Sequence, residues 1–219
     1  MLRGGILIIV DIREYNICAI VASFDKKKLK ELYKLNAYRG ELSYSLSAFQ
    51  YDGYKVTNLS LDQGLGKIPE TLISELADGS YYITHTQAPT TEADNIHPAV
   101  YGNCYLWHNG IIKQKSLSPG TWDTQWLQEQ ILSYGWSSLS RIDGTFACLM
   151  YNVNDLFVFR NEISPMYYDK ALNFSSTRFN NSISLPPNIV YKINLQYQAI
   201  DAVAYFDTFE NPYYIPETT

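Results

Sequence analysis

Apolar and polar positions along the chain alternate mostly with the period of β-strands. Strand-like runs are predicted near the N-terminus at residues 6–10 and 17–24. The stretch 39–62 is predicted to form short polar and aromatic strands, separated by turns such as Asp52-Gly53. Further strands are predicted, each bounded by turn residues, at 81–86, 105–108, 110–113, 145–152, 156–160, 166–169, 171–176 and 189–195.

Three segments have helical spacing instead. Residues 25–35 begin with Asp25, a predicted N-cap, and carry Leu29, Leu32 and Leu35 on one side. The other two predicted helices lie at 68–76 and 122–134. A few helices among many antiparallel strands predict an α+β layered domain in which one sheet packs on another.

Composition and charge narrow the class of protein. Of the 219 residues, 46% are hydrophobic, which is enough for a substantial core. The net charge of −5 argues against a surface that neutralises phosphates, so nucleic acid is an unlikely partner on this ground. The apolar run at 6–10 is too short for a signal-peptide core or a membrane span. We therefore expect a cytoplasmic protein with no membrane partner.

The cysteines and histidines offer little for metal binding. Three widely spaced cysteines without a CxxC pair predict a reduced intracellular chain and no structural zinc site. His85, His97 and His108 fall close together in the sequence but lack HxH or HExxH spacing. The sequence therefore predicts no metal site, and each histidine alone could be a hydrogen-bonded structural residue.

Seven short fragments occur in an order that is informative as a set. They are Cys-Ala-Ile-Val at 18–21, Tyr-Arg-Gly at 38–40, His-Thr-Gln-Ala-Pro-Thr at 85–90, Ile-His-Pro at 96–98, Trp-His-Asn-Gly-Ile-Ile at 107–112, Asp-Thr at 123–124 and the stretch 160–168. Each is weak alone. Together they resemble the glutaminase domain of class II glutamine amidotransferases, in the N-terminal-nucleophile (Ntn) hydrolase superfamily.

This resemblance implies a fold and a chemistry. The fold is a four-layer αββα sandwich of two stacked antiparallel sheets flanked by helices, over a domain at 18–219 that follows an extension or propeptide at 1–17. An N-terminal cysteine thiolate, here Cys18, would attack the side-chain amide of glutamine and form a thioester. The free α-amine of that cysteine would serve as the base. Asn109 and Gly110 would stabilise the oxyanion.

The resemblance also implies the binding residues and partners. Asp123 would hold the α-ammonium of the substrate, and the substrate-binding set would be Arg39, His85, Gln87, Thr90, His97 and Asp123. No cofactor or metal is implied. The substrate would be glutamine or a related amide. Because no acceptor domain follows before Thr219, the released ammonia would go to a separate synthase.

Each central residue also has a plain structural interpretation. Cys18 could be a small buried hydrophobe on an apolar strand. Asn109-Gly110 could form a type I′ hairpin turn. Asp123 could be the N-cap of the helix predicted at 122–134.

Three positions depart from the family pattern. Cys18 is internal, so either residues 1–17 are cleaved, or the chain starts later, or the extension is retained and the amine base is missing. Gln87 stands where the family has an arginine that pairs with the substrate carboxylate, so charge-assisted bidentate binding is lost there. Ala19 replaces a glycine and adds a methyl group beside the nucleophile.

These departures leave two main hypotheses for function. The first is a working amidohydrolase, either for glutamine or, more narrowly, for another amide. The second is a catalytically inactive protein that serves as an interaction or assembly module.

Overall fold

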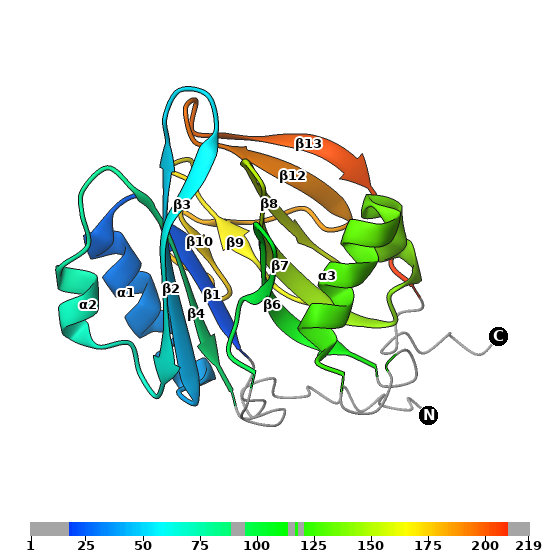
Figure 1. Cartoon of the computed structure of the whole chain (residues 1–219), viewed down its shortest axis with the longest axis horizontal. Coiled ribbons are helices and arrows are strands. Elements are labelled where there is room, and N and C mark those ends of the chain that lie inside the picture. Colours follow the sequence, from blue (N-terminus) through cyan, green and yellow to red (C-terminus); the bar gives the residue numbers. More distant parts are fainter. Residues whose placement is uncertain (1–17, 89–94, 114–116, 118–120, 210–219) are drawn as a thin grey trace, which may run out of the picture.

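The computed structural model describes residues 18–88, 95–113, 117 and 121–209, which form two antiparallel sheets (Figure 1). The strand predicted at 6–10 lies outside these residues. The first sheet has the order β11-β9-β10-β1-β4-β2-β3. Its strands are β1 (Ala19–Ser23), β2 (Ser43–Tyr51), β3 (Val56–Leu65), β4 (Tyr81–Gln87), β9 (Tyr167–Tyr168), β10 (Phe174–Ser175) and β11 (Ile183–Ser184).

The second sheet has the order β13-β12-β8-β7-β6-β5. Its strands are β5 (Ala99–Tyr101), β6 (Cys104–Ile112), β7 (Gly144–Asn152), β8 (Asp155–Arg160), β12 (Ile189–Asn194) and β13 (Ala199–Tyr205). The helices are α1 (Lys26–Asn36), α2 (Glu70–Ser74) and α3 (Asp123–Tyr134), with 3₁₀ turns η2 (Ala37–Arg39) and η4 (Trp136–Arg141).

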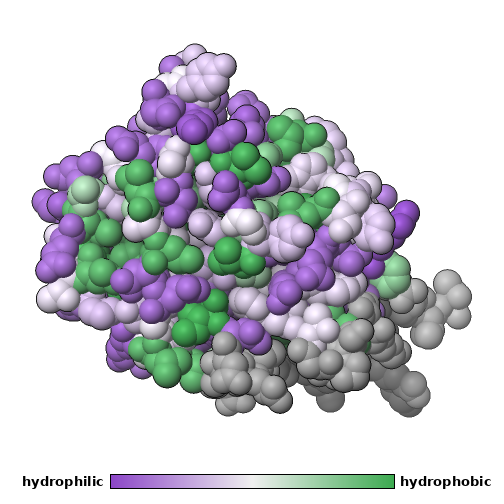
Figure 2. All heavy atoms as spheres, in the orientation of Figure 1, coloured by the Kyte–Doolittle hydropathy of each residue, from purple (hydrophilic) through white to green (hydrophobic). Residues whose placement is uncertain are grey.

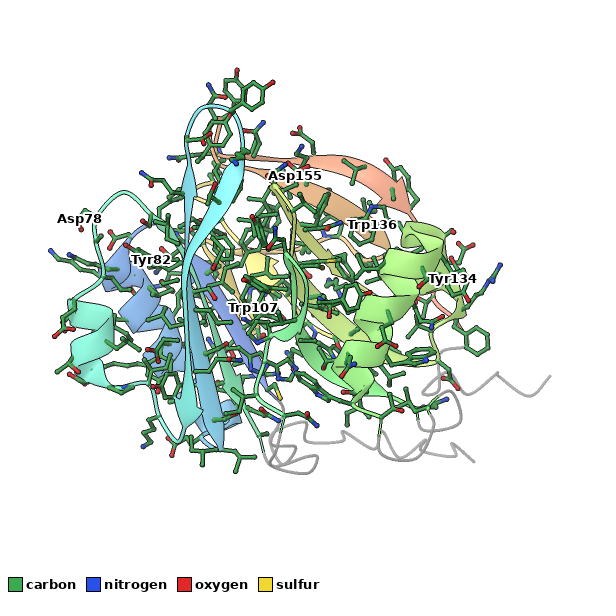
Figure 3. All side chains as sticks on the ribbon, viewed as in Figure 1. Asp78, Tyr82, Trp107, Tyr134, Trp136 and Asp155 are labelled. Atoms are coloured by element: carbon green, nitrogen blue, oxygen red, sulfur yellow. The ribbon has the colours of Figure 1, made fainter. Side chains whose placement is uncertain are left out.

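The main core lies between the two sheets. Alternate residues of each strand point into it, so Ile20 and Ala22 of β1 face Leu149 and its neighbours on β7. Trp107 of β6 is fully buried there, between the two sheets in Figure 3, and its indole N–H donates to Ser45 Oγ at 3.2 Å. The packing of these two apolar faces removes a large set of hydrophobic side chains from water, which stabilises the fold.

The outer face of each sheet is covered by helices (Figure 1). Val21 of β1 points away from the inter-sheet core and packs with Leu29 and Leu32 of α1. On the second sheet, Phe146 and Met150 of β7 point outward and pack with α3 and η4. The order of layers is therefore helix, sheet, sheet, helix, which confirms the predicted αββα sandwich.

Helix α1 confirms its predicted start but corrects its buried face. Asp25 caps the helix by accepting from the N–H groups of Lys27 at 2.6 Å and Lys28 at 3.2 Å. Leu35, predicted to share the buried face, is 38% exposed. Asn36 occupies that face instead, because seven residues return almost to the azimuth of Leu29 on a helix of 3.6 residues per turn.

Two strand predictions were wrong in extent. The segment 39–62 was predicted as short strands, whereas β2 and β3 form one long hairpin with the predicted turn at Asp52. Figure 2 shows this hairpin projecting from the body of the molecule, with mainly hydrophilic side chains at its tip. The strands predicted at 105–108 and 110–113 are one continuous strand, β6.

Strand β13 was not predicted, because most of its side chains are exposed and it lacks a clear alternation. It is followed by Phe206, which is buried and packs on Phe146 with ring centroids 5.7 Å apart. No helix in the described part of the chain is long and apolar enough to cross a membrane.

The packing between the sheets predicts how far a cavity there would lower the free energy of unfolding. Leu149 is fully buried, so Leu149→Ala should lower the free energy of unfolding by about 2–5 kcal/mol, measured by urea denaturation. Leu59 of β3 is 53% exposed, so the matched control Leu59→Ala should change it by no more than about 0.5 kcal/mol. Equal effects of the two substitutions would contradict the packing described above.

Candidate active site

The candidate site lies where the inward-facing positions of the first sheet change from apolar to polar. In the register of the sheet, Ile20 of β1 is opposite His85 of β4, and His85 is opposite Ser45 of β2. Two residues further along, Gln87 is opposite Ser43, and Cys18 immediately precedes β1. Because side chains alternate along a strand, Cys18, His85 and Gln87 all point into the gap between the sheets.

A small pocket opens at this end of the molecule. Its volume is about 50 Å³. Strands of both sheets and the start of α3 meet around it. It is lined by Cys18, Gln87, His97, His108, Gly110, Ile111, Trp122, Asp123 and Thr124.

Cys18 is buried and held by its backbone. Its carbonyl oxygen accepts from Arg39 Nε at 3.2 Å. Burial raises the pKa of the Cys18 thiol to about 11, against smaller opposing effects from the backbone of Ala88 and the charge of Arg39. While Cys18 is joined to residue 17, its sulfur is therefore a thiol near neutral pH. A base is needed to convert it into the nucleophilic thiolate.

The Tyr-Arg-Gly fragment positions Arg39 by close backbone packing. A Cβ on Gly40 would lie 2.5 Å from the backbone nitrogen of Ala88 and the carbonyl carbon of Gln87. Only glycine lets this turn cross the end of β4 at that distance. The crossing holds η2, and with it Arg39, against Cys18.

Asn109 and Gly110 lie inside β6, so they are not a hairpin turn. They pair with Ala147 and Phe146 of β7. The side chain of Asn109 points between the sheets, where its Nδ2 donates to Ser176 Oγ at 3.1 Å. The same hydroxyl accepts from the N–H of Ile20 at 3.0 Å, so Ser176 joins β1 of one sheet to Asn109 of the other.

The backbone of β6 presents an open edge at Gly110. The partner of β6 on that side, β5, pairs only with residues as far as Leu106. Antiparallel pairing alternates, so the N–H groups of Gly110 and Ile112 point to the same edge. That of Ile112 donates to Asp123 Oδ2 at 3.2 Å, and that of Gly110 is directed to the same edge, beyond the end of the pairing with β5.

Glycine is required at position 110. Its φ is +154°, and a Cβ there would lie 1.9 Å from the carbonyl oxygen of Thr145 and 2.8 Å from His108 Nε2. Any side chain would force β6 away from β7. Gly110 lines the pocket together with Cys18, and Asn109 precedes it in β6. The N–H of Gly110 and the Nδ2 of Asn109 are two donors held by the pairing of β6 with β7, of the type that can bind an oxyanion.

Asp123 is the first residue of α3, and the N-cap position belongs to Trp122. Its carboxylate accepts from Ile112 N–H and, at 3.3 Å, from the Thr124 hydroxyl. The positive end of the helix dipole also favours its charge. With 14% of its side chain exposed at the pocket, Asp123 can still accept a hydrogen bond from a cationic ligand.

The three histidines are packed together beneath the pocket. His85 and His97 stack with ring centroids 3.9 Å apart. Burial lowers the pKa of His85 to about 3 and that of His97 well below its ordinary value. His85 Nε2 donates to the carbonyl oxygen of His108 at 3.1 Å, which is a second link between the sheets. These two rings are neutral and act as packing and hydrogen-bonding groups.

Both ring nitrogens of His108 have partners inside the protein. Its Nε2 donates to the Thr145 carbonyl at 3.2 Å, and its Nδ1 lies 3.2 Å from Thr124 Oγ1. The same hydroxyl lies 3.0 Å from His97 Nε2. Thr124 thus links two of the rings to the start of α3.

Gln87 is buried but turned toward the pocket. Its Oε1 accepts from Ser43 Oγ at 2.7 Å, so the other atom of the amide, Nε2, faces the pocket. Ser43 thereby fixes the orientation of the amide, which then offers donors to a ligand.

The structure brings the predicted residues Cys18, Gln87, His97, Gly110 and Asp123 to one pocket. Arg39 contacts Cys18, His85 stacks on His97, and Asn109 precedes Gly110 in β6. Thr90 lies outside the described residues. His108, Thr124 and Ser176 were not predicted, although two of them directly adjoin predicted site residues in the sequence. Within the described residues no group of three or more His, Cys, Asp or Glu side chains is arranged to hold a metal ion.

Comparisons with known proteins agree with this geometry at the level of the fold. No family model matches the sequence, and no curated protein matches it. Among solved structures, a glutamine phosphoribosylpyrophosphate amidotransferase from B. subtilis, in complex with ADP and GMP, has a TM-score of 0.59 and 18% identity. That match covers 85% of this chain and 48% of the other.

A second structure, of an allosteric regulatory enzyme of purine biosynthesis, has a TM-score of 0.61 and 18% identity, over 88% of this chain and 50% of the other. The chain spans about half the length of both proteins. The αββα fold of this chain is therefore similar to that of these two solved structures.

Proposed function

We propose that this chain is a glutamine-type amidohydrolase whose nucleophile is Cys18 once it is N-terminal. The Cys18 sulfur attacks the carbon of a side-chain carboxamide, and ammonia leaves after protonation. The resulting thioester is then hydrolysed by water to a carboxylate and the free thiol. The ammonia is passed to a separate synthase.

The observation that carries the proposal is the pair of donors beside Cys18. The N–H of Gly110, a residue that lines the pocket, is directed to the edge of β6 that β5 leaves open, and Asn109 Nδ2 has one of its two hydrogens left after bonding Ser176. Both come from β6, whose position is fixed by pairing with β7. Preorganised donors of this kind stabilise the developing oxyanion.

The α-amine of Cys18 is the base in this proposal. A free α-amine titrates near pH 7.7–8.0, so it can take the thiol proton at neutral pH. The thiol itself ionises only at about pH 11 in the present environment. Removal of residues 1–17 is therefore the step that creates the active enzyme.

The second candidate function is an interaction or assembly module with the same fold. It is favoured by the burial of Cys18 and its raised pKa, which leave the sulfur unreactive while the upstream peptide bond is intact. It is also favoured by the neutral Gln87, which offers no charge to a substrate carboxylate.

The intact mass of the purified protein separates these candidates. A chain that begins at Cys18 should release ammonia from a carboxamide substrate, and Cys18→Ala should abolish this activity. Cys104 is also buried but lies beside Gln128, away from the pocket, so Cys104→Ala should keep it. An intact 219-residue mass with no ammonia release would favour the module instead.

The reactivity of Cys18 should depend on pH in a defined way. In the full chain, alkylation by iodoacetamide should be slow at pH 7.5 and rise about tenfold per pH unit, because only the thiolate reacts and the pKa is about 11. Peptide mass spectrometry would follow Cys18 separately from the other cysteines. A rate near that of an unperturbed thiol at neutral pH would contradict the burial described above.

Gly110→Ala tests the oxyanion donor. Displacement of the N–H should lower the rate of ammonia release by at least about 10²-fold. Gly79→Ala is the matched control, since Gly79 also has positive φ but no atom lies within 4 Å of an added Cβ. It should cost about 1 kcal/mol of stability and leave the rate unchanged. Melting temperatures of both variants would exclude unfolding as the cause.

A further inference from the structure

The charges around the pocket indicate what kind of amide it accepts. Among the described residues that line it, Asp123 is the only acidic or strongly basic side chain. The rings of His85 and His97 are neutral because burial lowers their pKa. Both ring nitrogens of His108 are used by Thr145 and Thr124, so neither is left for a ligand.

Arg39 contacts Cys18 but does not line the pocket. It donates through Nε to the carbonyl oxygen of Cys18 at 3.2 Å. Its Nη2 is buried and has no hydrogen-bond partner among the described residues. Lys113, the described lysine nearest in sequence to the lining, pairs with Asp143 at 2.7 Å.

Among the described residues that line the pocket, a ligand therefore meets one carboxylate and no arginine or lysine. An ammonium group gains a charge-assisted hydrogen bond to Asp123. A carboxylate would lose its hydration without gaining an opposite charge, and it would also be repelled by Asp123. A neutral carbonyl, in contrast, can accept from Gln87 Nε2, which Ser43 has oriented toward the pocket.

We propose that the pocket binds a glutamine whose α-amine is free and whose α-carboxyl is blocked as an amide, as in the N-terminal glutamine of a peptide. The ammonium group is bound by Asp123, and the carbonyl of the blocked carboxyl accepts from Gln87. The side-chain carboxamide is the group that reaches Cys18, and this last assignment rests on the proposed function. A small glutamine amide and a peptide N-terminus share this chemistry.

Isothermal titration calorimetry on the full chain tests the inference without requiring catalysis. L-Glutaminamide should bind at least about tenfold more tightly than L-glutamine, since the two differ only in the carboxyl group. N-Acetyl-glutaminamide, which lacks the ammonium, should bind about tenfold more weakly than glutaminamide. A Gln-Ala-Ala peptide distinguishes a peptide N-terminus from a small amide, and binding of either class supports the proposal.

Two variants test the assigned partners. Gln87→Arg should reverse the preference and favour L-glutamine, and Asp123→Asn should remove the preference for the free amine. Gln125→Arg adds the same charge at an exposed position of α3 and should leave both preferences unchanged. Melting temperatures report whether each variant folds, and the comparison of ligands on the unaltered chain stands even where a variant does not.

The outcomes separate this inference from the proposed function. Tighter binding of L-glutamine than of glutaminamide, or no binding of either, would overturn the substrate assignment. Hydrolysis of L-glutamine by a chain that begins at Cys18 would in that case leave the amidohydrolase proposal standing. Selective binding of glutaminamide without any hydrolysis would support the pocket assignment and overturn the enzyme.

Discussion

The apolar core layer between the two sheets fixes the direction in which the side chains of its strands point. Once Ile20, Ile83 and Trp107 are committed to that layer, alternation along β1, β4 and β6 also commits Cys18, His85 and Asn109 to it. The polar residues stand at one end of the layer, and hydrogen bonds through Ser176 and His85 join the sheets there. The candidate site is therefore a continuation of the core.

At the polar end of this layer, two glycines lie in close contact with the backbone of neighbouring strands. Gly40 lies against the end of β4, and Gly110 lies against Thr145 of β7. At both glycines the nearest opposing atoms belong to the backbone, so they cannot rotate away as a side chain could. Close backbone packing thus sets the spacing between Arg39, Cys18 and the donors of β6, while the histidines fill the remaining volume.

Much of this architecture could be predicted from the sequence, because strand alternation and the Asp25 cap are local signals. The buried face of α1 was assigned wrongly at Leu35, since hydrophobicity alone favours a leucine over Asn36. The continuity of β6 was missed because an Asn-Gly pair is a strong turn signal in isolation. His108 and Thr124 could not be assigned to the pocket from spacing, because their meeting depends on where α3 docks on the open edge of β6.

The contact of Phe206 with Phe146 has a consequence for where this domain can be shortened. Phe146 is the pairing partner of Gly110, and Phe206 packs on its outward face at the end of β13. The residue that follows β13 therefore supports the backbone of β6 at Gly110, although the two are distant in the sequence. A fragment that stops within β13 would lose this aromatic contact beneath one wall of the pocket.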